Sequence, residues 1–162
     1  MGVYYLDTSA LVKRYVAEPG SAWMMAQCQP EAGHTLIVSQ ATLVEAVATF
    51  CRKARQQDLS QRISDAERDH IITLFRRDAR RYSIVKVTST IYTYAGDLCR
   101  VHSLRAYDAV QLACALVVRN KLAAMDIQAP TFVSADTELL NIAKDEGLSI
   151  EDPSLHLSAE DR

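Results

Sequence analysis

Short apolar segments alternate with longer amphipathic stretches along the whole chain, and this alternation constrains the fold more than any other feature. Short runs rich in Val, Ile, Phe and Tyr are typical of buried strands, whereas apolar residues at helical spacing are typical of helices. Strands and helices that alternate in this way form a parallel sheet covered on both faces. The expected strands are residues 3–6, 35–38, 83–87, 131–134 and 148–150.

Hydroxyl and acidic residues mark where the expected helices begin. Thr8 and Ser9 are the expected N-caps of a helix that carries apolar residues as far as Val16. The sequence from Ser64 to Glu67 has the form of a capping box. Further helices are expected to begin near Ser21, Ser39, Thr88, Ala106 and Ala135, and the helix after Ser39 is expected to carry Leu43, Val44, Val47 and Phe50 on one side.

Length and composition fit one domain without a membrane segment. The 162 residues suffice for a full core, and we assign residues 1–152 to a single domain and residues 153–162 to a polar C-terminal tail. No apolar run is long enough to cross a bilayer and no signal peptide is evident, so we expect a cytoplasmic protein. Because the net charge is −2, a polyanion would need a local basic patch or a bound cation.

The four cysteines, Cys28, Cys51, Cys99 and Cys114, are widely scattered and include no C-x-x-C pair. A chain of this size does not need disulfides, and zinc ligands usually come in closely spaced pairs. We therefore expect four buried, reduced thiols and no zinc site.

Four acidic residues are expected at or near one edge of the sheet. Asp7 follows the first strand directly, and Asp136 lies two residues past the fourth, where open α/β sheets place their ligands. Glu45, in the second turn of its helix, can reach back toward that edge because helical side chains lean toward the N-terminus. Asp108 lies in the first turn of a mostly apolar helix, which is an unfavourable place for an unpaired charge. Each alone fits an ordinary cap, turn or surface acid, but the four together indicate a shared site.

Four ionised carboxylates in one pocket repel one another unless they take up protons or bind a cation. Ligation by carboxylate oxygens alone favours Mg²⁺, with Mn²⁺ as an alternative. One or two such ions can activate a water molecule for attack on a phosphodiester. A phosphatase with an aspartyl nucleophile is disfavoured, because Asp7 lacks a second acid two residues later.

Four segments give the sequence its resemblance to PIN-domain proteins, in particular the VapC-like toxins of bacterial and archaeal toxin–antitoxin pairs. They are Tyr5–Lys13, Val44–Ala46, Leu104–Ala113 and Phe132–Asp136, in the right order over nearly the whole chain. The resemblance implies a three-layer α/β/α sandwich with a central parallel sheet of four to five strands. It also implies a metal-dependent ribonuclease whose catalytic, metal-binding acids match Asp7, Glu45, Asp108 and Asp136.

The same resemblance implies the partners. Such proteins are usually homodimers that cleave RNA to leave a 5′-phosphate and a 3′-hydroxyl, and the C-terminal segment of a cognate antitoxin plugs their active groove. A toxin ribonuclease is therefore the primary hypothesis. The alternatives are an RNA-processing nuclease of the same fold without an antitoxin, and an inactive relative that binds RNA or protein.

One departure from the family pattern concerns the fourth acid. The segment between Asp108 and the fourth expected strand is long and contains Asp126, which is a rival for this role. We favour Asp136, because Asp126 follows a helical stretch and no strand delivers it to the sheet edge.

Several other residues have a functional and a structural interpretation. Thr8 and Ser134 are candidates to bind a water ligand or the scissile phosphate, and Arg105 to bind phosphate or orient a carboxylate. Capping or surface pairing are the alternatives, and capping is favoured for Ser9. None of the four histidines is assigned a catalytic role, since their spacing does not suit a metal.

Two clusters fit ordinary surface or core roles better than binding roles. One cluster is basic, and a solvated helix face explains it more simply than an RNA-guiding surface does. The other is a cluster of Trp and Met, which we expect to belong to the core, with a groove for an antitoxin helix as the alternative. The basic residues are Arg52, Lys53, Arg55, Arg76, Arg77, Arg80 and Arg81, and the apolar cluster is Trp23, Met24 and Met25.

Overall fold

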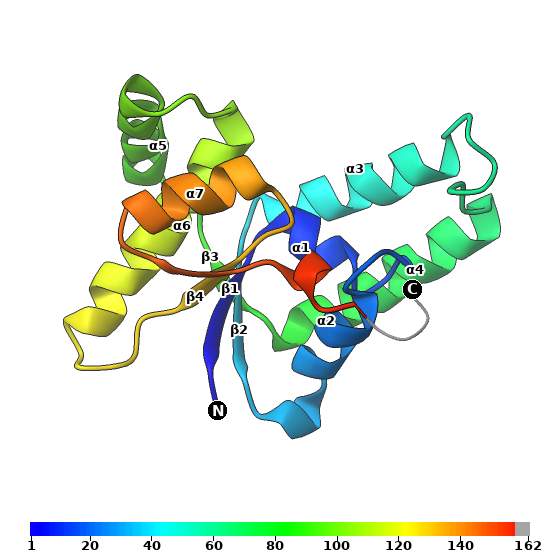
Figure 1. Ribbon diagram of the computed structural model, residues 1–162, viewed down its shortest axis with the longest axis horizontal. Helices are drawn as coiled ribbons and strands as arrows, with labels where there is room; N and C mark the ends of the chain where they lie inside the picture. The colour runs from blue at the N-terminus through cyan, green and yellow to red at the C-terminus, as the bar shows by residue number, and fades with distance from the viewer. Residues whose placement is uncertain (158–162) are drawn as a thin grey trace.

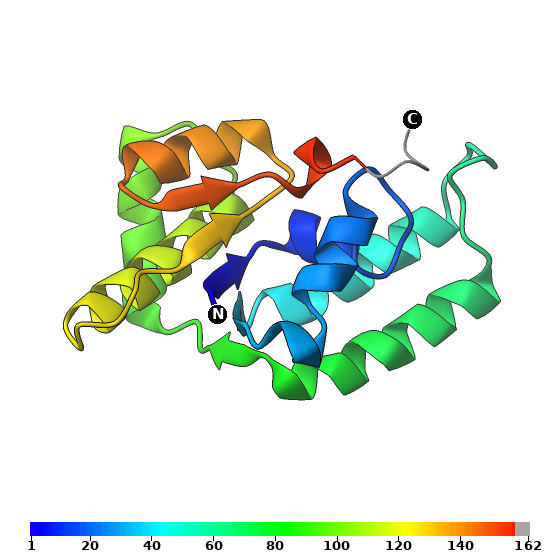
Figure 2. The ribbon, with the colours of Figure 1, turned by 60° about the horizontal axis from the view of Figure 1, so that its bottom comes forward.

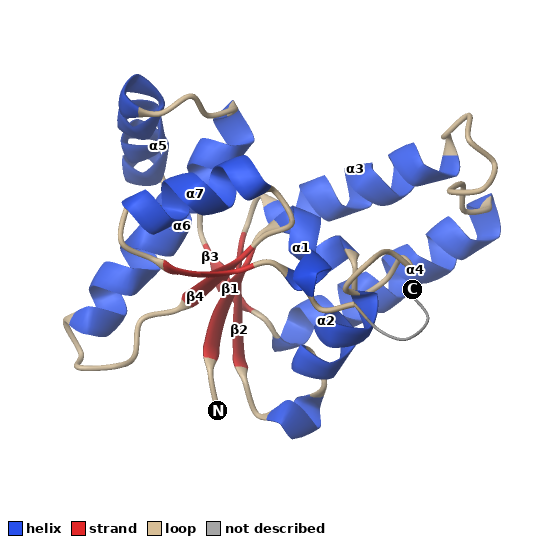
Figure 3. Cartoon of the chain, viewed as in Figure 1, coloured by secondary structure: helices blue, strands red, loops and turns tan. Residues whose placement is uncertain are grey.

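The computed structural model describes residues 1–157 and has a parallel five-stranded sheet at its centre (Figures 1 and 3). The strands lie in the order β3-β2-β1-β4-β5, and every neighbouring pair is parallel. All five expected strands are present: β1 (Val3–Leu6), β2 (Thr35–Ser39), β3 (Ser83–Val85), β4 (Thr131–Val133) and β5 (Ser149–Glu151). The predicted parallel α/β architecture is confirmed.

Helices connect the strands in the predicted order. The α-helices are α1 (Thr8–Val12), α2 (Ser21–Gln27), α3 (Thr42–Ala54), α4 (Asp65–Asp78), α5 (Ser89–Val101), α6 (Ala106–Ala123) and α7 (Thr137–Asp145). Short 3₁₀ turns are η1 (Pro30–Ala32), η2 (Ala79–Arg81) and η3 (Pro153–Leu155). In the part of the chain that the structure describes, no helix combines the length and the apolar character that a membrane span requires.

Two hydrophobic cores lie on opposite faces of the sheet. Along β1, Tyr5 joins the core formed with α5, α6 and α7, whereas the next residue, Leu6, joins the core formed with α1 to α4. Phe132 and Val133 of β4 divide in the same way, as expected where successive strand residues point to opposite faces. Figure 2 shows the resulting three layers, with α5 to α7 separated from α1 to α4 by the sheet.

The first helix differs from its prediction at both ends. Asp7 is the N-cap residue, and its carboxylate accepts the backbone N–H of Ser9, whereas Thr8 is already helical. The helix ends at Val12 because the next turns tighten to i→i+3 bonds, such as that from Tyr15 N to Val12 O. This places the Tyr15 ring against Phe50 and Phe75 in the core below α3 and α4.

Three smaller predictions are also corrected. Val44 is 60% exposed, because it lies on the outer side of α3. The edge strand β3 ends at Val85, opposite Ser39, since its partner β2 ends there. All four cysteines are free, as predicted, but Cys99 is exposed and Cys51 is only partly buried.

The start of the predicted C-terminal tail lies against α2. A Cβ atom at Gly20, the residue before α2, would collide with the carbonyl of Pro153, and the Trp23 ring stacks on His156 at 4.6 Å between centroids. The remainder of the predicted tail, residues 158–162, lies outside the described residues.

Candidate active site

The carboxyl ends of β1 and β4 meet at the centre of one sheet edge because these strands are parallel neighbours. Asp7 follows β1, and Asp136 is the N-cap residue of α7 after β4. Asp108 comes from the first turn of α6, and Glu45 from the first turn of α3, one turn earlier than predicted. Four elements distant in sequence thus each present one acid near this edge.

A single hollow of about 380 Å³ brings these acids together. All four carboxylates line it, together with two arginines and four smaller or uncharged residues. Its lining consists of Asp7, Thr8, Ser9, Glu45, Arg52, Arg105, Ala106, Tyr107, Asp108 and Asp136. The expectation that the acids share one pocket therefore agrees with the geometry.

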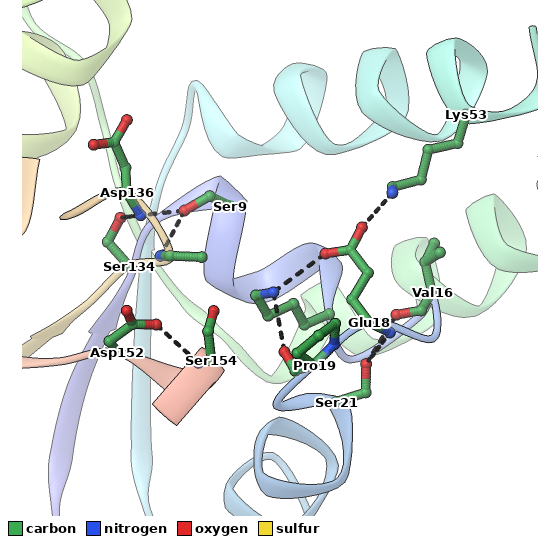
Figure 4. Close-up of polar contacts among 12 residues, drawn as sticks. Ser9, Val16, Glu18, Pro19, Ser21, Lys53, Ser134, Asp136, Asp152 and Ser154 are labelled. Atoms are coloured by element: carbon green, nitrogen blue, oxygen red, sulfur yellow. Dashed lines mark hydrogen bonds and ion pairs between the residues drawn. The ribbon is translucent and has the colours of Figure 1, made fainter. Parts of the chain in front are cut away.

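Hydroxyl groups from the start of α1 and from the loop after β4 hold the carboxylate of Asp7. Its Oδ2 accepts the Ser9 hydroxyl at 2.6 Å and the Ser134 hydroxyl at 3.1 Å. The two hydroxyls are themselves 3.1 Å apart, and the Ser134 Oγ also accepts the backbone N–H of Asp136 (Figure 4). Ser9 and Ser134 thus tie the start of α1 to the loop after β4.

Glu45 is held by a separate network that sequence reasoning missed. Its Oε2 accepts the Thr8 hydroxyl at 2.9 Å and the Nε2 of Gln111 at 2.6 Å. Gln111 lies on α6, three residues after Asp108 and therefore on the same helix face. An amide within an otherwise apolar helical run was the signal available in the sequence.

Burial and mutual repulsion act on the acids. Burial raises the pKa of Asp7 despite the lowering effect of the bonds from Ser9 and Ser134. Burial also raises the pKa of Asp108, and the nearby charges of Asp7, Asp136 and Glu45 raise it further, while Arg105 lowers it. The charges of the other three acids therefore act on Asp108.

The donor set suits a hard divalent cation, since every acidic ligand offers carboxylate oxygen. Within residues 1–157, however, no three His, Cys, Asp or Glu side chains are gathered tightly enough to hold a metal ion as they stand. Like charges repel, and one oxygen each of Asp7, Glu45 and Asp136 is already engaged by a protein donor. The residues fit a cation in chemistry, but their side chains must move to close on it.

Two arginines, one from α3 and one from the start of α6, border the hollow. Arg105 precedes α6, and Arg52 lies near the end of α3. Neither forms an ion pair with a carboxylate among the described residues. Other members of the basic cluster have structural partners: Lys53 pairs with Glu18 (Figure 4), Arg77 with Asp78, and Arg81 donates to the carbonyl of Cys28.

The remaining candidates lie elsewhere. Asp126 follows the end of α6 with a positive φ of 56° and does not line the hollow. Within the Trp–Met cluster, Met24 is buried in the core, whereas Met25 is 46% exposed. His102 bonds Glu146 and His156 bonds Glu151, away from the four acids.

A family model and a known relative each match most of the chain. The PIN domain family model matches residues 4–145. Ribonuclease VapC45 of Mycobacterium tuberculosis (strain CDC 1551 / Oshkosh) is 36% identical over 119 residues, which cover 73% of this chain and 78% of that protein.

Solved structures share the fold at low sequence identity. PAE2754 from Pyrobaculum aerophilum superposes with a TM-score of 0.59 at 16% identity, over 95% of this chain and 85% of that one. A toxin–antitoxin complex from Klebsiella pneumoniae contains a chain with a TM-score of 0.56 at 14% identity, covering 93% of this chain and 97% of that one.

Proposed function

Because this chain belongs to the PIN-domain family, we propose that it is a metal-dependent endoribonuclease and the toxin of a toxin–antitoxin pair. The observation that carries the proposal is the convergence of Asp7, Glu45, Asp108 and Asp136 on one hollow. The 36% identical ribonuclease supports the choice of RNA as substrate.

In this proposal the four acids hold Mg²⁺, or Mn²⁺ in its place. A divalent cation so held supplies an activated water nucleophile and neutralises charge that develops on the phosphate. Hydroxyl and amide donors hold Oδ2 of Asp7 and Oε2 of Glu45, which restricts where the other oxygen of each carboxylate can lie. Thr8 and Ser134 act by orienting these carboxylates.

Arg52 and Arg105 bind the RNA backbone on either side of the acids. Both guanidinium groups line the hollow, and a guanidinium matches the geometry of a phosphate with paired N–H donors. They offset the repulsion between a polyanion and an acidic site. Cleavage leaves a 5′-phosphate and a 3′-hydroxyl.

The proposed partners are those that the resemblance to the family implies. We propose that the protein acts in the cytoplasm as a homodimer, and that the C-terminal segment of an antitoxin blocks the hollow. The structural likeness to a chain of a toxin–antitoxin complex supports such a partner. A small reading frame next to the gene, whose product co-purifies with this chain, distinguishes a toxin from an RNA-processing nuclease.

Cleavage of single-stranded RNA by the purified protein tests the activity. We expect cleavage with Mg²⁺, none with EDTA, and none for D7N with Mg²⁺. D126N is the matched control, since it removes an equal charge outside the hollow. Cleavage that persists in EDTA or in D7N would overturn the proposal, and the absence of cleavage in the wild type would favour an inactive binding relative.

A further inference from the structure

Gln111 is a fully buried amide beside the acidic hollow. It has no exposed surface, although its neighbours on α6 are nearly all apolar. Its Nε2 lies 2.6 Å from Glu45 Oε2, 3.0 Å from Thr42 Oγ1 and 3.2 Å from Thr8 Oγ1. A buried amide needs hydrogen-bond partners. Here one of those partners is the carboxylate of Glu45, a candidate metal ligand.

The surroundings fix which way the amide faces. A carboxylate only accepts hydrogen bonds, so the NH₂ group of Gln111 must face Glu45. On the other side, Oε1 accepts the hydroxyl of Tyr5 at 2.9 Å. Tyr5 is itself fully buried and stacks on Phe132 at 5.6 Å between centroids. Rotating the amide by half a turn would place its oxygen against the carboxylate.

The amide and the hydroxyl of Thr8 together hold one oxygen of Glu45. Both donate to Oε2, and no residue in the range 1–157 hydrogen-bonds to Oε1. Glutamate has three side-chain torsions, so an unheld Glu45 would sample many positions around the hollow. Two donors on Oε2 restrict these torsions and leave Oε1 available as a ligand.

We propose that Gln111 is a positioning residue, which fixes Glu45 for a divalent cation and is itself oriented by Tyr5. This inference rests on the proposed function, because it assigns Glu45 a ligand role. A purely structural role, in which Gln111 only joins α6 to α3 through Thr42, is the alternative.

Titration of the intact protein with Mn²⁺, followed by calorimetry, distinguishes these roles. Q111L keeps the side-chain volume but removes the donor to Glu45, and we expect the Mn²⁺ affinity to fall by about 10- to 100-fold, as for lost outer-shell partners of metal ligands. Y5F removes only the hydroxyl that orients the amide, and we expect a smaller loss in the same direction.

The buried Asp78 provides the matched control for lost stability. D78N weakens the bonds from Arg14, neither residue lines the hollow, and the variant should lower the melting temperature without changing Mn²⁺ affinity. If folded Q111L binds Mn²⁺ as tightly as the wild type, the positioning role is wrong. If Q111L does not fold, unchanged affinity in Y5F would likewise rule out the positioning role.

The wild-type titration separates this inference from the proposed function. Mn²⁺ binding that D7N abolishes, together with wild-type affinity in Q111L, would contradict the role of Gln111 alone. If the wild type binds no Mn²⁺, or if D7N binds Mn²⁺ as tightly as the wild type does, the metal site is wrong and with it the proposed function.

Discussion

Ser134 donates a hydrogen bond of 3.1 Å to Asp7, 127 positions away in the sequence. This contact joins the ends of β1 and β4 at a single carboxylate oxygen, which also accepts the hydroxyl of Ser9. The bond orients Asp7, but the carboxylate remains buried and its pKa remains raised. The site therefore holds a charge that the fold alone does not fully stabilise.

Replacing Asp7 should stabilise the metal-free protein. An acid with a raised folded pKa is more easily ionised in the unfolded state, so it destabilises the fold at neutral pH. D7N removes this charge and keeps an N-cap side chain, and we expect a gain of about 1 kcal/mol in unfolding free energy. Thermal unfolding in EDTA at pH 7.5 should show a melting temperature higher by roughly 2–4 °C.

The stability difference between D7N and the wild type should depend on pH. As pH falls through the folded pKa of Asp7, the wild-type carboxylate takes up its proton and regains stability, so the advantage of D7N should shrink. A D7N protein that melts below the wild type at pH 7.5 would show that Asp7 is a structural residue.

The fourth acid can be assigned by one pair of substitutions. Asp136 lines the hollow and Asp126 does not, so D136N should abolish Mg²⁺-dependent RNA cleavage while D126N leaves it unchanged. Asparagine is also a good N-cap, so α7 should remain folded in D136N. Circular dichroism checks this point, and the reverse pattern of activities would transfer the role to Asp126.

The two arginines of the hollow should contribute to the salt dependence of RNA binding. If Arg52 and Arg105 each contact one phosphate, R52Q and R105Q should each lower the slope of log affinity against log salt by about 0.7 for single-stranded RNA. Binding is measured in EDTA with a fluorescent oligonucleotide. R80Q on the exposed surface after α4 is the control, and an unchanged slope in R52Q and R105Q would remove both from the RNA path.

Asp78 should make the stability of the fold sensitive to acid. Burial opposes its ionisation, but hydrogen bonds from Arg14 at 2.8 Å and Arg77 at 3.1 Å outweigh it and lower the pKa of Asp78. A lowered pKa gives stability that is present above the unfolded pKa and is lost as pH falls through the folded one. We expect D78N to lose about 3 kcal/mol at pH 7 in urea unfolding, with the two proteins converging in acid.

The sequence predicted the sheet and the four acids because each strand is a short apolar run that ends at a recognisable breaker or acid. It placed Glu45 one turn too late, because the helix was expected to begin near Ser39 and begins at Thr42. Ser39 and Thr42 are three residues apart and both are residue types that cap helices, so the sequence marks this boundary weakly. It also missed Gln111 and Asp78, whose roles depend on partners more than 60 residues away in sequence. The only local sign was the amide of Gln111 within an apolar helical run, and it did not identify the partners.

If four acids from distant parts of the sequence hold one cation, Mn²⁺ titration of the purified protein must detect that site. We predict binding by the wild type and by D126N, and a loss of at least about 10-fold in affinity for each of D7N, E45Q, D108N and D136N. Wild-type affinity in all four of these variants, or no binding by the wild type, would contradict the account.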